Sequence, residues 1–374
     1  MADVRKPPFR AEHVGSMPRP ARLMDAREAF EAGKLRHEEL KRIEAECIAE
    51  VVAMQERVGI GAITDGEYPK SGWSSFLFEK CDGFGERVGE SPFTFTMFDG
   101  STRNAPGMPK PHSKIRRREP LSAADFSVLK SMTKRPIKAN LPTPSIAYTG
   151  GDGGLAGSYY KDRASYFADV IEIMQEEIAD LASRGCTYLQ MDEVPLAVLC
   201  DPNNRERLRV RGEDPDSLID TYIDAINGAI SKRPADMTVC VHMCRGNVGH
   251  GMADGGYEPI AERLFGRLKV DGYFLEYDTP RAGDFAPLRF VPKTARVVLG
   301  LMTTKLEDIE SEDSLKRRLD EASKVIPLDQ LGLSPQCGFS SSASRTSAQR
   351  LRLALDQVER KLARLVKVAD QVWG

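Results

Sequence analysis

The stretch TVCVHM (238–243), followed by EPIAERLFGR (258–267) and then GYFLE (272–276), decides the fold of this chain. The first and third segments are apolar runs of strand length, and the middle one has the spacing of a helix with one apolar face. A strand, a helix and a second strand in this order are typical of α/β proteins with a parallel sheet.

The same alternation of strands and helices extends outward in both directions. The strand candidates are residues 12–16, 60–65, 137–141, 187–192, 238–243, 272–276, 297–302 and 331–335. Helical patterns cover residues 37–58, 166–182, 215–231, 258–267, 312–325 and 348–372. This series predicts an α/β fold, a single (β/α)8 TIM barrel over residues 1–374. The alternative is a doubly wound open sheet, but no G-x-G-x-x-G follows a strand to support it.

One segment interrupts the alternation. Residues 82–120 are rich in Gly, Pro, Ser and charge, and only FTFTMF (93–98) alternates like a strand. Connections this long inside a compact domain are usually functional excursions or disordered segments. We therefore expect an inserted loop or hairpin after the second strand. Its run Arg116-Arg117-Arg118 indicates either a solvated surface or a lid or subunit contact.

Composition excludes several classes of protein. The 53 Lys and Arg residues nearly balance the 55 Asp and Glu residues, for a net charge of −2, so no nucleic-acid partner is expected. No apolar run approaches the roughly 20 residues that span a bilayer, and residues 1–8 do not resemble a signal peptide. The sequence predicts a cytoplasmic protein with no membrane span. Its seven cysteines, an odd number, argue against a disulfide framework.

The end of the 238–243 strand carries candidate metal ligands. Side chains alternate faces along a strand, so His242 and Cys244 project to the same side. They stand at the carboxyl end, where barrel enzymes place their active sites. The alternative interpretation is a buried thiol beside a histidine that is satisfied within the core.

Two further residues follow apolar strands in the same way. Glu276 ends GYFLE, and Cys337 follows the 331–335 strand. A carboxylate at such a position is poorly explained by core packing, because charges are seldom buried unpaired. One imidazole, two thiolates and a carboxylate form a tetrahedral zinc set, of which the carboxylate is most easily displaced. This convergence favours a Zn²⁺ site at His242, Cys244, Glu276 and Cys337 over packing of these residues in the core.

Motifs along nearly the whole chain carry a family resemblance. They are RAEHVGS (10–16), TDGE (64–67), YLQMDE (188–193), the His242/Cys244 strand, LE (275–276) and SPQCG (334–338). With these motifs the chain resembles the cobalamin-independent methionine synthases, in particular their catalytic C-terminal barrel and short single-barrel relatives. The resemblance implies zinc-dependent transfer of a methyl group to the thiolate of homocysteine, giving methionine. Exchange of Glu276 for the incoming sulfur is also implied by it.

The resemblance also assigns substrate contacts. Glu67 and Asp192 match the positions that hold the homocysteine ammonium, and Gly15 and Ser16 match the turn that receives its carboxylate. Two acids around one cation form charge-assisted hydrogen bonds. The alternative is that Asp192 and the neighbouring Glu193 cap the helix that follows them.

Some departures concern the methyl donor. The family proper has a second barrel with no counterpart here, and residues 148–160 contain no Trp where the family stacks the pterin. Lys305 aligns with a family histidine linked to protonation of the leaving group. Lys305 and Asp192 are therefore taken together as the candidate catalytic side chains. The donor is open between methyltetrahydrofolate and a methylcorrinoid.

Two other functions are open at this stage. The first is zinc-dependent alkyl transfer to a different thiol, as in the epoxyalkane:coenzyme M transferases, and the second is metal binding without catalysis. A sulfonate thiol lacks an ammonium and does not need Glu67 and Asp192, so that pair favours homocysteine. Expected partners are therefore small molecules, homocysteine and a methyl donor, and self-association is left open.

Overall fold

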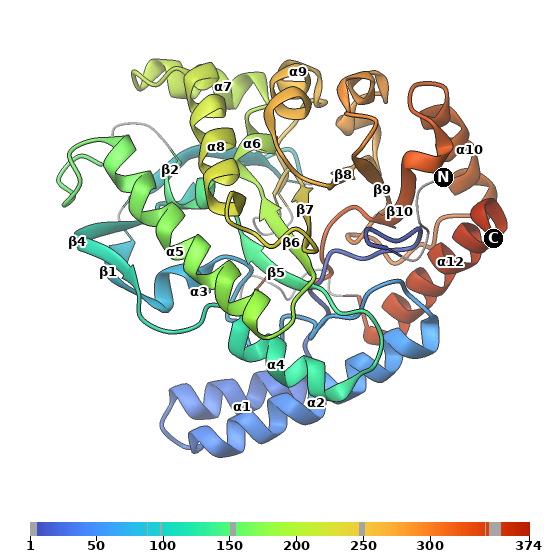
Figure 1. Ribbon diagram of the computed structural model, residues 1–374, viewed down its shortest axis with the longest axis horizontal. Coiled ribbons are helices and arrows are strands. Elements are labelled where there is room, and N and C mark those ends of the chain that lie inside the picture. Colours follow the sequence, from blue (N-terminus) through green and yellow to red (C-terminus); the bar gives the residue numbers. More distant parts are fainter. Residues whose placement is uncertain are drawn as a thin grey trace.

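Six neighbouring parallel strands form most of the barrel wall in the computed structural model (Figure 1). The structure describes residues 6–87, 89–97, 99–149, 155–246, 251–340, 342–343 and 353–374. The strands are β5 (Ala139–Pro142), β6 (Tyr188–Glu193), β7 (Thr238–Met243), β8 (Gly272–Glu276), β9 (Arg296–Met302) and β10 (Leu331–Pro335). Their spatial order follows the chain from β5 to β10.

Two short bridges continue this sheet beyond its outer strands. Ala11 pairs with Leu333 of β10 and Ile63 pairs with Ile137 next to β5, both in parallel. The Gly61 N–H donates to the Ala11 carbonyl oxygen at 3.0 Å, which joins the two segments to each other. The eight expected strand positions therefore close into a ring, and the (β/α)8 barrel is confirmed.

The expected strands at 12–16 and 60–65 are nevertheless only bridges, because side chains bond their backbones. The Gln55 side chain accepts from the Thr64 N–H and donates to the Thr64 carbonyl oxygen, both at 2.9 Å. The Val14 carbonyl oxygen likewise accepts from the side-chain amides of Asn140 and Gln190. A backbone group that is satisfied in this way forms no ladder bond with a neighbouring strand.

Helices cover the outside of the barrel, as Figure 1 shows. The longer ones are α1 (Ala21–Glu31), α2 (His37–Val58), α4 (Ala123–Met132), α5 (Arg163–Ser183), α8 (Pro215–Ile230), α9 (Glu258–Arg267), α10 (Glu312–Ser323) and α12 (Leu355–Trp373). The shorter ones are α3 (Ser75–Glu79), α6 (Pro195–Val198), α7 (Pro202–Val210) and the 3-10 turns η1 (Pro144–Ala147), η2 (Pro280–Ala282), η3 (Ala286–Phe290) and η4 (Leu328–Gln330). Both α2 and α9 have the predicted limits. No helix in the described ranges is long and apolar enough to cross a membrane.

The segment at 82–120 forms antiparallel strands. β1 (Cys81–Arg87) pairs with β4 (Pro109–Arg117), and β2 (Glu90–Thr96) pairs with β3 (Thr102–Pro106). In Figure 1, β1 and β4 lie at one edge of the molecule beside α5. Arg117 forms ion pairs with Glu177 and Asp180 of α5, at 2.7 and 2.6 Å, so the central arginine of the run packs against the barrel, whereas Arg116 and Arg118 are exposed to solvent.

The barrel interior is layered along β7. Cys240 is fully buried in a small apolar cluster with Ala62, Tyr188, Phe274 and Val298. His242 stands two residues further along the same strand, on the same face. The apolar cluster around Cys240 therefore lies in the barrel interior, one layer below His242 and the carboxyl end of the barrel.

Candidate functional site

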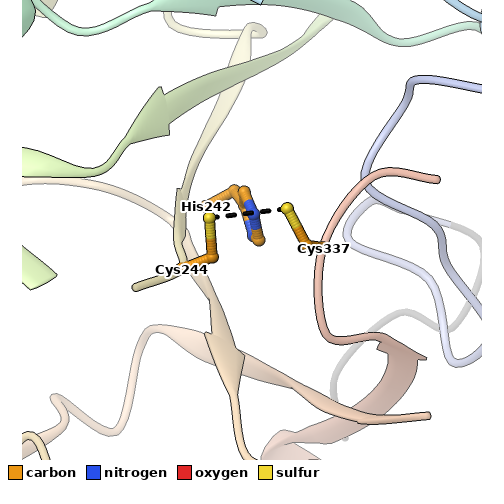
Figure 2. A group of neighbouring side chains, drawn as sticks. All are labelled: His242, Cys244 and Cys337. Carbon is orange, nitrogen blue, oxygen red and sulfur yellow. Dashed lines mark hydrogen bonds between the residues drawn. The ribbon is translucent and has the colours of Figure 1, made fainter. Parts of the chain in front are cut away.

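Three predicted metal ligands meet at the carboxyl ends of β7 and β10. The nitrogen and sulfur ligand atoms of His242, Cys244 and Cys337 all lie within 4.8 Å of one another. Figure 2 shows the two sulfurs facing each other next to the imidazole of His242, and they share a hydrogen bond 3.4 Å long. All three side chains are buried. The strand period predicted the His242/Cys244 pair, and the barrel places Cys337 beside it.

The chemistry of this group fits a metal ion. Neither ring nitrogen of His242 has a hydrogen-bond partner among the described residues, although the side chain is only 3% exposed. Contact with Cys244 lowers the pKa of the Cys337 thiol well below its ordinary value, and the pKa of Cys244 rises correspondingly. A buried imidazole without a hydrogen-bond partner beside two cysteine sulfurs is a donor set that suits Zn²⁺. The alternative of a satisfied core histidine does not fit this geometry.

Glu276 lies outside this group of three. Its Oε2 accepts the backbone N–H of Arg245 at 2.9 Å. Its Oε1 lies 3.8 Å from Arg245 Nη1 and 3.6 Å from Arg281 Nη2, with no hydrogen bond from any described residue. The structure thus places the fourth predicted ligand next to the group, with its carboxylate held by a backbone amide and flanked by two guanidinium groups.

A cavity of about 110 Å³ opens onto the group of three. It is lined by Val14, Ser16, Glu67, Trp73, Phe95, Asp192, Val194, His242, Cys244, Gly246, Cys337 and Gly338. Most of this wall is apolar, and its polar groups are concentrated at Ser16 and the two acids. A pocket with apolar walls and a few convergent polar groups is the usual form of a small-molecule site.

The two predicted ammonium-binding acids face this cavity together. Asp192 is the last residue but one of β6 and lies in register with His242 of β7, and its carboxylate accepts from Gln190 at 2.7 Å and Asn140 at 3.3 Å. Glu67 lies in the loop after the second bridge segment, and its Oε2 has no hydrogen-bond partner within the described residues. Burial raises the pKa of Glu67 to about 7 and also raises that of Asp192. A cationic ligand would offset both shifts.

Glu193 takes the capping role that was the alternative for this acidic pair. Its Oε1 accepts from the Leu196 N–H of α6 at 2.6 Å, and its Oε2 accepts from the hydroxyls of Thr143 and Ser145. Neighbouring residues on a strand point to opposite faces. The cap interpretation is therefore correct for Glu193, and Asp192 is directed to the cavity.

The predicted carboxylate-binding turn lies at the cavity edge. Ser16 lines it, and Ser16 Oγ accepts the Ser340 N–H at 3.3 Å. Gly15 has φ +144°, and a Cβ there would lie 2.8 Å from the Asn140 amide nitrogen. A Cβ on Gly338 would lie 2.0 Å from Ser16 Oγ. Gly15 and Gly338 shape the turn, whereas Ser16 offers the polar group.

Lys305 lies beside the site but is not among the residues that line the cavity. It follows β9, it is 4% exposed, and its positive charge helps to lower the pKa of Cys337. Lys305 also faces Asp278, whose pKa burial raises to about 7. Within residues 148–160, the stretch that contains no Trp, residues 150–154 lie outside the described part of the chain.

Two lining residues escaped the sequence prediction. Phe95 of β2 reaches the cavity from the 82–120 segment, and a Cβ on Gly246 (φ +92°) would lie 2.3 Å from its ring. Asn204 holds this strand by hydrogen bonds with the backbone N–H and carbonyl oxygen of Thr94. The alternating FTFTMF pattern indicated a strand, but not where that strand docks.

Comparisons with known proteins agree with this geometry. Residues 9–360 match the family model described as the catalytic domain of cobalamin-independent synthase. The uncharacterized Bacillus subtilis protein YxjH is 35% identical, over 99% of this chain and 96% of its own. A methionine synthase from Pyrococcus furiosus is 25% identical, over 90% and 88% of the two chains.

Solved structures give the same result. A candidate vitamin-B12 independent methionine synthase from Listeria monocytogenes superimposes with a TM-score of 0.74 at 31% identity, covering 98% of both chains. A B12-independent methionine synthase from Shewanella has a TM-score of 0.73 at 20% identity, and it shows the fold. On the motifs, the barrel and the match over residues 9–360, this chain belongs to the family of cobalamin-independent methionine synthase catalytic domains, which are methyltransferases.

Proposed function

We propose that this protein is a zinc-dependent methyltransferase that converts homocysteine to methionine. One observation carries the proposal: two buried acids, Glu67 and Asp192, line the same cavity as the His242, Cys244 and Cys337 group. The acids suit an ammonium group and the cluster suits a thiol-activating metal. Homocysteine carries both an ammonium and a thiol.

His242, Cys244 and Cys337 would hold the zinc ion, with Glu276 as an exchangeable fourth ligand. Zinc supplies a thiolate at neutral pH, where a free thiol with a pKa near 8.5 is mostly protonated. The rest of the site binds and orients the amino acid. Glu67 and Asp192 accept hydrogen bonds from the ammonium, and Ser16 donates to the carboxylate.

The cavity walls support the same assignment. Phe95 and Trp73 give the cavity an apolar surface, and its volume of about 110 Å³ suits a small amino acid. Apolar walls exclude water from the nucleophile and strengthen the charge interactions of the two acids. Each acid pairs with the ammonium more strongly there than it would in open solvent.

Two methyl donors are compatible with the proposal. Methyl transfer from methyltetrahydrofolate needs a proton on the leaving nitrogen. Methyl transfer from a methylcorrinoid needs no proton, because the leaving group is the corrinoid in its cobalt(I) state. Lys305 is the cation next to Cys337 that could serve the leaving group, and it stands in place of the histidine that the resemblance associates with this proton transfer. We infer that the corrinoid is the better donor.

Alkyl transfer to a sulfonate thiol, as in coenzyme M chemistry, is the second candidate. It would use the same metal group, but a sulfonate would meet the buried acids Glu67 and Asp192 across a cavity of about 110 Å³. Like charges in a dry site repel strongly. The acids therefore favour homocysteine.

The test is a turnover assay with the zinc-loaded protein. Homocysteine is supplied with methylcobalamin or with methyltetrahydrofolate in mono- and triglutamate forms, and methionine is measured. Coenzyme M with an epoxyalkane serves as the comparison reaction. Methionine formation supports the proposal, and product from the comparison reaction alone would reject it.

A further inference from the structure

A buried arginine directly follows the Cys244 ligand. The Arg245 side chain is fully buried, and its guanidinium lies 4.3 Å above the ring of Tyr257. Its Nε donates to the Gly255 carbonyl oxygen at 2.6 Å, and its Nη1 donates to the Glu276 carbonyl oxygen at 3.2 Å. Its Nη2 has no partner in the described chain. A buried cation that keeps a free N–H requires an explanation, because such groups are normally satisfied.

The carboxylate of Glu276 faces this cation but does not close a salt bridge with it. Oε1 lies 3.8 Å from Arg245 Nη1 and 3.6 Å from Arg281 Nη2, beyond hydrogen-bond length in both cases. Within the described residues, the hydrogen bond that Oε2 accepts comes from the backbone N–H of Arg245. The carboxylate is fully buried, so the two guanidinium charges stabilise it without forming a bidentate salt bridge with it.

The backbone around this pair is fixed. The Tyr257 hydroxyl accepts the Glu276 N–H at 3.0 Å and donates to the Met243 carbonyl oxygen at 2.8 Å. The ends of β7 and β8 are thereby tied together, and the side chain of Glu276 is the part left to rotate. The Glu276 carboxylate is close enough to His242 and Cys244 to interact electrostatically with both, and it lies within 4.0 Å of both guanidinium groups.

We propose that Arg245, assisted by Arg281, is a positioning residue that receives the Glu276 carboxylate when it is off the metal. The inference rests on the proposed function, in which Glu276 yields its place to the substrate thiol. A released carboxylate that is buried without a counter-charge is strongly disfavoured. The two guanidinium groups supply that counter-charge, so they shift Glu276 away from the metal and favour entry of the thiol.

The experiment measures zinc transfer to a chelator and homocysteine binding by calorimetry, both on the holoenzyme. Arg281→Met is the first variant because the Arg281 side chain is 24% exposed and its loss should leave the fold intact. With less counter-charge the carboxylate stays on the metal, so zinc release slows and homocysteine binding weakens, each about two- to fivefold. Arg281→Lys, which keeps the charge, should restore both values.

Arg245→Met should act in the same direction and more strongly, about tenfold, because its guanidinium is fully buried. Arg289→Met is the matched control, since Arg289 pairs with Glu258 at an exposed surface position and should leave both values unchanged. In a Glu276→Gln background, Arg281→Met should have no further effect, because there is no charged carboxylate to receive.

Unchanged or faster zinc release in Arg281→Met would overturn the proposal even if Arg245→Met failed to fold. A purely structural role for Arg245 predicts faster zinc release, the opposite sign. Failure of the proposed function is a separate result, because it would appear as wild-type protein that binds no zinc or forms no methionine.

Discussion

Replacement of Glu67 by glutamine should stabilise the fold at alkaline pH and weaken substrate binding. The pKa of Glu67 is raised from 4.5 to about 7 by burial, so the folded state holds its proton more tightly than the unfolded state does. A raised carboxyl pKa gives stability that is complete below pH 4.5 and is lost as the pH rises through 7. Each pKa unit is worth about 1.36 kcal/mol, so the ionised carboxylate costs about 3 kcal/mol at pH 8.

Glutamine keeps the size of the side chain and removes the charge. Glu67 is the one described non-glycine residue with a positive φ, +59°, and glutamine keeps a side chain of the same shape at that strained position. We therefore expect Glu67→Gln to be about 3 kcal/mol more stable than wild type at pH 8, and less than about 1 kcal/mol more stable at pH 5. Denaturant unfolding of the zinc-loaded protein at both pH values measures this difference. Glu119→Gln, at an exposed carboxyl, should show no such pH dependence.

The same variant should bind homocysteine about ten- to a hundredfold more weakly, because a charged hydrogen bond is worth roughly 1.5–3 kcal/mol. In wild type the Michaelis constant for homocysteine should rise as the pH falls below 7, since protonated Glu67 no longer attracts the ammonium. In Glu67→Gln that dependence should be much reduced. A variant no more stable than wild type at pH 8, with an unchanged Michaelis constant, would refute the assignment of Glu67 as the ammonium partner.

Other substitutions test the remaining parts of the site. Cys337→Ala should weaken zinc binding about a hundredfold in a chelator competition, whereas Cys240→Ala, in the layer below, should keep one zinc per chain. Gly246→Ala should destabilise the protein by about 1–3 kcal/mol in denaturant unfolding, and by less in a Phe95→Ala background, because the added Cβ would meet the Phe95 ring at 2.3 Å. Lys305→Met should lower turnover with methyltetrahydrofolate about a hundredfold, and with methylcobalamin far less, if this lysine serves the leaving nitrogen. Equal losses with the two donors would remove Lys305 from that role.

The proximity of His242, Cys244 and Cys337 could be predicted from sequence because it follows from regular rules of strand and barrel geometry. A period of two places His242 and Cys244 on one face, and the ends of parallel strands meet at one rim of the barrel, which brings Cys337 to them. The direction of the Glu276 side chain depends on the two guanidinium groups near it, and nothing in the local pattern of GYFLE shows them. Position on a strand was predictable, whereas the balance of charges around the side chain was not.

The shortening of the strands at 12–16 and 60–65 and the position of Phe95 in the cavity wall could not be predicted either. The segments 12–16 and 60–65 are expected to be strands, but side-chain amides take backbone bonds that a ladder would need. Gln55 bonds the backbone of Thr64, and Asn140 and Gln190 bond the Val14 carbonyl oxygen. Phe95 reaches the cavity because Asn204, distant in sequence, holds the backbone of its strand. The shortened strands and the position of Phe95 both depend on polar side chains that bond the backbone of another segment. Hydrophobic periodicity carries no information about such bonds.

A comparison of Glu193 in β6 with Glu67 shows which property distinguishes a ligand-binding carboxyl group from a structural one. Burial raises the pKa of both Glu67 and Glu193 to about 7, so this shift does not distinguish them. Both oxygens of Glu193 are occupied by donors from α6, Thr143 and Ser145, and its charge has only a structural use. Glu67 Oε2 has no donor within the described residues and lies at a cavity that it shares with Asp192. An unsatisfied acceptor costs stability unless a ligand pairs with it, so the missing partner, more than the raised pKa, supports the proposal that Glu67 binds the substrate ammonium.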